Sequence, residues 1–234
     1  MSKSNKLWGG RFEKDTASSM ANLSKSTHFD WRLATFDLLQ TDVHVQALNR
    51  SKLLSDAETK QIRNAIKDIH NKVSSGALKP NDTDEDVHTA IERMIIESVE
   101  EIGGKIRAGR SRNDQVVTDF KLFLRGSARI ISQELVGLCN AINEQASKYF
   151  DQASPGFTHL QHAQPVTLGH ELAKHSQALL RDIERFTDWD ARVDTCPLGA
   201  GALAGSALVT DSMWVANQLG FSRPSENSID AVSD

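Results

Sequence analysis

A six-residue turn, Gly109 to Asp114, holds the side chains best suited to chemistry in this chain. It carries two arginines, a serine and an asparagine directly before a long amphipathic stretch that starts at Gln115. Forked guanidinium donors and free helix N-terminal amides converge on anionic oxygens, and an asparagine amide adds one donor and one acceptor that orient a ligand. These residue types indicate a pocket for a small molecule rich in carboxylates. The alternative is an exposed basic turn in which Asn113 or Asp114 caps the helix.

A second polar cluster runs from Thr158 to Pro165, in a break between two long helical stretches. A hydroxyl, an imidazole and two amides lie close together there, and such groups can bind an oxyanion and move a proton. The alternative is a polar loop with a satisfied histidine. A metal site is disfavoured, because no carboxylate or cysteine joins the four histidines of this region at ligand-like spacing. Those histidines are His159, His162, His170 and His175.

Two other stretches of the sequence are weaker candidates for a functional site. The stretch Asp84 to His88 presents carboxylates and an imidazole at a helix start, where acidic residues also complement the helix dipole without any ligand. The dipole explanation is favoured for the first two residues, whereas Asp86 and His88 stay open. The glycine-rich stretch Gly199 to Gly205 lacks a Gly-Lys-Ser/Thr ending and follows no strand, so close backbone packing is favoured over nucleotide binding.

The elements that position these groups are expected to be helices. Apolar residues recur at spacings of three and four, which predicts helices over residues 30–49, 56–73, 87–99, 115–150, 167–193 and 210–219. The stretch from Thr83 to Asp86 resembles a capping box, and Gly103-Gly104 closes the helix behind it. A helix over 115–150 would span roughly 50 Å, a length typical of bundles and oligomer cores. No stretch combines a strand pattern with hairpin signals.

The expected fold is therefore all-α. Residues 1–108 are predicted to form a small N-terminal helical domain. Residues 109–234 are predicted to form the first, incomplete part of a central domain, a bundle of long helices. The composition changes near Gly103 to Gly109, which is where we place the boundary.

Composition excludes several classes of protein. The 234 residues carry a formal net charge of -4 and no basic block, so nucleic acid is not an expected partner. No apolar run approaches the roughly 20 residues of a membrane span, and the start has no signal-peptide pattern. Cys139 and Cys196 lie far apart, which favours two packed thiols in a reduced, cytoplasmic protein.

Five stretches, in this order along the chain, together resemble the argininosuccinate lyase family of the fumarase/aspartase superfamily, of which δ-crystallin is a close relative. They are Leu7–Phe12, Asp84–Ala90, Gly109–Thr118, Gly156–Pro165 and Pro197–Gly205. The resemblance implies reversible β-elimination of argininosuccinate to arginine and fumarate in arginine biosynthesis, without cofactor or metal, by a homotetramer. A base removes a proton next to a carboxylate, fixed donors stabilise the developing charge, and an acid assists departure of the guanidinium nitrogen.

The resemblance also implies roles for particular residues. His159 matches the family's catalytic histidine and would transfer protons. Asn113 and Thr158 match substrate-binding residues, and Arg112 would hold a carboxylate. Ser26 resembles a substrate-contacting serine, although its local sequence matches less well. The Asp-x-His pair, residues 86 and 88, ranks behind these five.

One signature of the family is absent from the 234 residues: a mobile Gly-Ser-Ser…Met-Pro-Gln-Lys-Lys-Asn-Pro loop. That loop supplies the serine usually cast as the base. The chain is therefore expected to be the N-terminal half of a lyase, with little activity alone and with uncovered apolar faces. The alternatives are a non-catalytic structural protein like δ-crystallin and another lyase of the superfamily, such as adenylosuccinate lyase.

Overall fold

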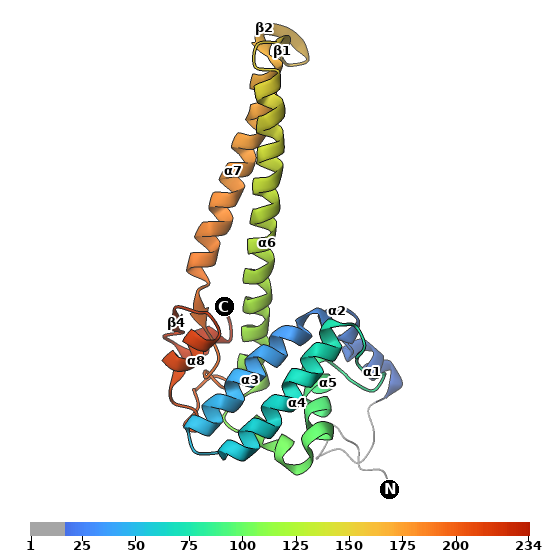
Figure 1. Ribbon diagram of the computed structural model, residues 1–234, viewed down its shortest axis with the longest axis vertical. Coiled ribbons are helices and arrows are strands. Elements are labelled where there is room, and N and C mark those ends of the chain that lie inside the picture. The colour runs from blue at the N-terminus through green and yellow to red at the C-terminus, as the bar shows by residue number, and fades with distance from the viewer. Residues whose placement is uncertain (1–16) are drawn as a thin grey trace.

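The computed structural model describes residues 17–234 and has two differently shaped parts. A cluster of shorter helices lies at one end, and a pair of long antiparallel helices projects from it (Figure 1). The predicted all-α fold is confirmed. The motif at residues 7–12 lies outside the described residues.

The helix cluster is built from amphipathic segments whose apolar stripes meet. Its elements are α1 (Ser18–Ser24), α2 (Thr27–Asp30), the 3-10 helix η1 (Trp31–Leu33), α3 (Ala34–Arg50), α4 (Asp56–Ser74), α5 (Val87–Val99) and the 3-10 helix η2 (Glu100–Arg107). The helices predicted over 30–49, 56–73 and 87–99 are confirmed. The spacing of Ile62, Ile66 and Ile69 explains why α4 forms: it places all three on one face, and all three are buried.

Two details of α5 differ from the sequence prediction. Its N-cap is Asp86, whose carboxylate accepts a hydrogen bond from the Thr89 amide at 2.6 Å, so the capping box expected to start at Thr83 is wrong. The two glycines do not close the helix either, because they lie inside η2. Gly103 is needed there for packing, since a Cβ at this position would lie 2.8 Å from the Ile96 Cα.

The projecting pair consists of α6 (Arg112–Lys148) and α7 (Leu168–Arg192). The 37 residues of α6 extend roughly 55 Å. The two helices converge near Gly169, where a Cβ would lie 2.3 Å from the Ala146 carbonyl oxygen, so glycine permits the close approach. Both long helices were predicted, although α6 begins three residues before Gln115.

The segment between the long helices is a β-hairpin, which the sequence did not predict. Strands β1 (Ala153–Thr158) and β2 (Gln161–Thr167) pair antiparallel. The two turn residues, His159 and Leu160, have φ angles of +52° and +62°. Hairpin turns of this kind usually carry Asn or Gly, and the absence of both here explains why no hairpin was predicted.

The chain then returns to the helix cluster (Figure 1). Its last elements are β3 (Thr195–Cys196), α8 (Ser212–Gln218), β4 (Arg223–Pro224) and α9 (Ser228–Ala231). The helix predicted over 210–219 is confirmed, but the last residues contain a short helix and are not wholly irregular. Leu198, Val215 and Phe221 belong to the same buried core as Leu38 and Ile91. The domain division at residues 108 and 109 stays a proposal.

Both cysteines are buried and free, as expected. Among residues 17–234, no helix combines the length and the apolarity that crossing a membrane requires.

Candidate active site

The first turn of α6 is fixed by a capping box. Ser111 is the N-cap: its hydroxyl accepts a hydrogen bond from the Asn113 amide at 3.2 Å, and its own amide donates to Asp114 Oδ1 at 2.9 Å. The alternative in which Asn113 or Asp114 caps the helix is therefore wrong. The helix begins at Arg112, so Arg112 and Asn113 lie in its first turn, where the positive end of the helix dipole favours an anion.

The two arginines of the turn have different surroundings. Arg110 points inward, and its Nη1 donates to Gln40 Oε1 at 2.6 Å and to Thr41 Oγ1 at 2.9 Å. Arg112 is half-buried, and its Nη1 donates to Gln115 Oε1 at 3.1 Å. Arg110 is therefore a structural residue, whereas Arg112 keeps donors for a ligand.

Asn113 and Asp114 also divide between exposed and structural roles. Asn113 is exposed, and its side-chain amide donates a hydrogen bond to the Ala202 carbonyl at 3.2 Å. Asp114 is buried and accepts from the amides of Gly199 and Gly201 at 3.0 and 2.9 Å. Burial raises the pKa of Asp114 although these amides oppose the shift. The glycine-rich stretch thus serves close backbone packing, as predicted.

Ser26 lies beside the start of α5. Its hydroxyl donates to Asp30 Oδ2 at 2.5 Å, and its amide donates to the Glu85 carbonyl at 2.8 Å. Arg112 approaches the same helix further along, because its Nη2 lies 3.5 Å from Glu92 Oε2. The five steps from Val87 to Glu92 rise roughly 8 Å along the helix axis. Ser26 and Arg112 therefore border one helix.

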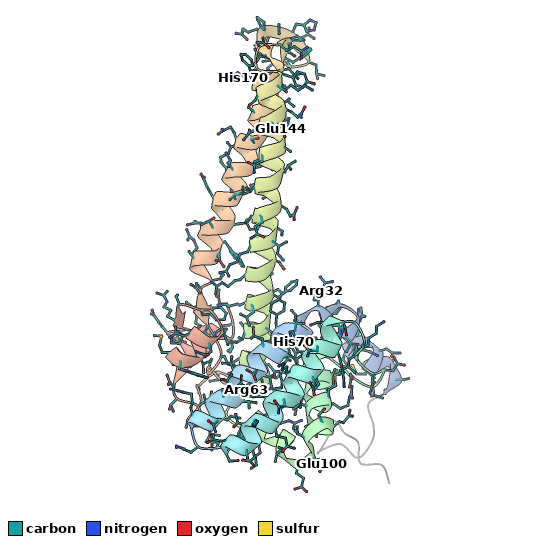
Figure 2. The ribbon with its side chains drawn as sticks, in the orientation of Figure 1. Arg32, Arg63, His70, Glu100, Glu144 and His170 are labelled. Atoms are coloured by element: carbon teal, nitrogen blue, oxygen red, sulfur yellow. The ribbon has the colours of Figure 1, made fainter. Side chains whose placement is uncertain are left out.

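Thr158 and His159 lie at the opposite end of the molecule, at the exposed tip of the hairpin. In Figure 2, Glu144 and His170 mark this end of the long helices. Because α6 separates its start from the hairpin by roughly 55 Å, one copy of the chain cannot bring His159 to Arg112 and Asn113. The predicted site residues thus form two separate groups.

A hollow of about 600 Å³ between α3 and α4 is not part of either group. Its lining includes Asp42, Arg63 and His70, and Arg63 and His70 are labelled in Figure 2. None of the predicted site residues lines it.

Sequence reasoning missed most of a buried charged cluster where α3, α5 and α6 meet. Its members are Asp37, His88 and Asp119. His88 Nδ1 lies 2.5 Å from Asp37 Oδ2 and 3.4 Å from Asp119 Oδ2. The one available signal was a charged residue on an apolar stripe, since Asp37 follows Leu33 by four positions.

The pKa values of the cluster follow from its geometry. Burial alone would lower the pKa of His88, but its contacts with Asp119 at 3.4 Å and with Asp37 at 2.5 Å outweigh burial and raise this pKa to about 10. Burial and the nearby Asp37 charge raise the pKa of Asp119 to about 7. Burial opposes ionisation of Asp37 as well, yet its hydrogen bond and charge contact with His88 bring the pKa below its ordinary value.

Known proteins are similar to this chain in sequence and in fold. The sequence profile of the lyase family matches residues 10–234. The chain is 50% identical over 229 residues to the argininosuccinate lyase of Acidothermus cellulolyticus, a match that covers 98% of this chain and 47% of that protein. It is also 50% identical to the argininosuccinate lyase of Thermobifida fusca, with 97% and 48% covered.

Solved structures give the same result for the fold. The crystal structure of EDDS lyase in complex with formate has a TM-score of 0.76 and 26% identity, and the match covers 91% of this chain and 41% of that one. A Brucella melitensis protein described as fumarate lyase:delta crystallin, bound to cobalt, has a TM-score of 0.72 over 96% of this chain and 52% of that one. Its 17% identity supports the fold alone.

The projecting helix pair and the cluster of shorter helices place the chain in the all-α fold of these lyases. The chain belongs to the lyase family, and its motif resemblance to argininosuccinate lyase is confirmed by sequence identity. It spans about half the length of the curated relatives it matches.

Proposed function

We propose that the chain forms part of an enzyme that splits argininosuccinate into arginine and fumarate in arginine biosynthesis. The observation that carries the proposal is the first turn of α6, where Arg112 and the exposed Asn113 lie at the positive end of the helix dipole. A dicarboxylate product such as fumarate suits that combination of donors. Identity of 50% to two argininosuccinate lyases supports the choice of substrate.

Each site residue then has a chemical task. Arg112 pairs with a substrate carboxylate, and Asn113 orients it with its amide. These fixed donors stabilise the negative charge that grows on the carboxylate when the neighbouring proton leaves. His159 transfers a proton, and Thr158 hydrogen bonds to substrate beside it. Ser26 contacts substrate from the start of α2.

The two groups of residues meet only if several copies of the chain assemble. The roughly 55 Å length of α6 supports a site shared between copies, as does the exposed hairpin tip. Large apolar side chains exposed along the helix pair support a partner surface. They include Val116, Phe120, Ile130, Ile131, Val136, Leu138 and Leu180. We infer that the assembly is a homotetramer of long-helix bundles.

The cytoplasm is the proposed location of the enzyme. The two free, buried thiols suit a reducing compartment.

The test uses what we call the extended chain: residues 1–234 followed by the remaining part of the Acidothermus cellulolyticus relative, of which the match covers 47%. Fumarate release from argininosuccinate is expected. Release from adenylosuccinate instead would assign another lyase activity. No turnover of either compound by a folded, assembled extended chain would contradict the proposal and favour a structural protein.

A further inference from the structure

The buried cluster of Asp37, His88 and Asp119 has no task in the proposed reaction. Asp37 and Asp119 are fully buried, and His88 is 4% exposed. Neither oxygen of Asp119 accepts a hydrogen bond of good geometry from the residues described, so its charge depends on His88 at 3.4 Å and on Arg110 nearby. Two buried carboxylates are costly unless positive groups pair with them. His88 between them and Arg110 beside them supply two positive charges, which is enough to balance both carboxylates when both are ionised.

A protonated His88 balances the charge of this cluster better than a bound metal ion would. The three side chains have ligand atoms close enough for one cation. Yet His88 Nδ1 already bonds to Asp37 at 2.5 Å, and the charge of Arg110 acts on both carboxylates. A divalent ion would leave the cluster with excess positive charge.

Asp37 connects the cluster to both arginines of the α6 start. Its two oxygens accept hydrogen bonds from Gln115 Nε2 at 3.1 and 3.0 Å, and Gln115 Oε1 accepts from Arg112 Nη1 at 3.1 Å. Its Oδ1 also accepts from Thr41 Oγ1 at 2.9 Å, and Thr41 in turn accepts from Arg110. Each arginine is therefore linked to Asp37 by hydrogen bonds through one intervening side chain, Gln115 for Arg112 and Thr41 for Arg110.

The charge on Asp37 determines how the Gln115 amide is turned. A carboxylate accepts hydrogen bonds, so it draws the NH₂ end of the amide and leaves the carbonyl end for Arg112. A turned-over amide would present its NH₂ group to the guanidinium, and two donors cannot bond to each other. Glu92 pairs with Arg112 on its other side, which leaves the guanidinium little freedom.

We propose that Asp37, His88 and Gln115 are positioning residues that hold Arg112 ready for a substrate carboxylate. His88 keeps Asp37 negatively charged, Asp37 orients Gln115, and Gln115 fixes the guanidinium. The inference rests on the proposed function only for the identity of the ligand. The position of Arg112 itself is a separate, measurable consequence.

The first experiment measures the side-chain position without activity. Crystal structures of the 234-residue chain and of its Gln115→Leu and His88→Gln variants would be compared. We expect Arg112 to move away from residue 115 in the first variant, and the Gln115 amide to turn or lose order in the second. An Arg112 unchanged in both variants would overturn the inference, even if the lyase activity were established.

The second experiment is a double-mutant cycle in the extended chain. Gln115→Leu is expected to lower kcat/KM for argininosuccinate by about 10- to 100-fold, mainly through KM, because a misplaced anchor weakens alignment of the substrate. In an Arg112→Lys background the same change should cost less than about twofold, since the residue it positions is already altered. Equal losses in both backgrounds would overturn the inference.

Two controls complete the design. Asp84→Asn removes another buried ion pair, with Arg93 at 2.8 Å, that does not lead to Arg112, and it should leave KM unchanged. Zinc alone, titrated into the 234-residue chain, tests the metal alternative. Tight one-to-one binding that is lost in His88→Gln would show a cation site and overturn the proton-based account. If the extended chain turns over nothing, the proposed function fails, and the crystal structures still decide the positioning role.

Discussion

At the scale of single residues, neighbouring side chains at the start of α6 have different roles: some hold the fold, and others are accessible to a ligand. Ser111, Asp114 and Arg110 use their polar atoms in hydrogen bonds within the protein, whereas Asn113 is exposed and Arg112 is half-buried. The substrate-binding capacity of the turn therefore rests on two residues out of six.

Asn113→Ala in the extended chain is expected to lower kcat/KM by about 100-fold or more, because it removes a donor aimed at the developing charge. Steady-state release of fumarate measures the effect. Asn71→Ala, on the exposed side of α4, is the matched control and should leave the rate unchanged. Equal rates for the two variants would remove Asn113 from the site.

His159→Ala should lower kcat by roughly 10²- to 10⁴-fold, the usual contribution of a positioned acid or base. KM should change much less, since the imidazole acts on the proton and not on binding. His70→Ala, far from the hairpin in Figure 2, is the control. A near-normal kcat for His159→Ala would refute its catalytic role.

The stability of the chain should fall as pH rises through the alkaline range. The pKa of His88, about 10, exceeds its ordinary value of 6.5, so its stabilising charge is complete below pH 6.5 and is lost as pH approaches 10. The pKa of Asp119, about 7, is also above its ordinary value, so loss of the Asp119 proton likewise lowers the stability as pH rises from about 4 to 7.

Melting temperatures measured across that range test the effect. His88→Gln should flatten the decline between pH 6.5 and 10, and His70→Gln should not. Parallel declines in the wild type and in His88→Gln would show that His88 carries no extra charge in the folded state.

At the scale of elements, two helices begin with the same capping motif in different surroundings. Both α4 and α6 start with a capping box, formed by Ser55 with Glu58 and by Ser111 with Asp114. Glu58 serves its own helix start and Lys105 near the surface, whereas Asp114 is buried and also holds two amides of the glycine-rich stretch.

Asp114→Ala should therefore destabilise the chain by about 2–4 kcal/mol, because three amides lose their acceptor in a buried place. Glu58→Ala should have a clearly smaller effect, since water replaces the lost contacts. Urea unfolding at one fixed protein concentration compares them. Equal losses would mean that the glycine-rich stretch does not depend on Asp114.

Features that depend on residues close together in the sequence could be predicted, and features that depend on contacts between distant residues could not. The helices α3 to α7 follow from stripes of apolar residues and were predicted. The hairpin was not, because its turn is His159-Leu160 and lacks the usual Asn-Gly. The link from His88 to Arg112 was beyond reach as well: it joins Asp37, His88 and Gln115 from three helices, and only the packed fold brings them together.

At the scale of the whole molecule, the projecting helix pair requires partners. Its exposed apolar side chains predict that the 234-residue chain self-associates, with a mass that is a multiple of 25.8 kDa in light scattering. Ile130→Lys should weaken association, whereas Ile229→Lys, equally exposed on α9, should not. A clean monomer without aggregation would contradict the prediction.

A polypeptide of residues 1–234 by itself is expected to release little or no fumarate, because it contains no serine loop of the kind that supplies the base in this family. Turnover near that of the extended chain would refute this expectation. It would also require a base among the residues already present.

The central claim is that Arg112 and Asn113 of one copy work with His159 of another. It is tested most directly by mixing two inactive extended chains, Asn113→Ala and His159→Ala, after dissociation and reassembly. If two copies combine at random, roughly a quarter of the sites contain both intact residues, so about a quarter of the wild-type activity should return. A reassembled mixture as inactive as either variant alone would contradict the shared site.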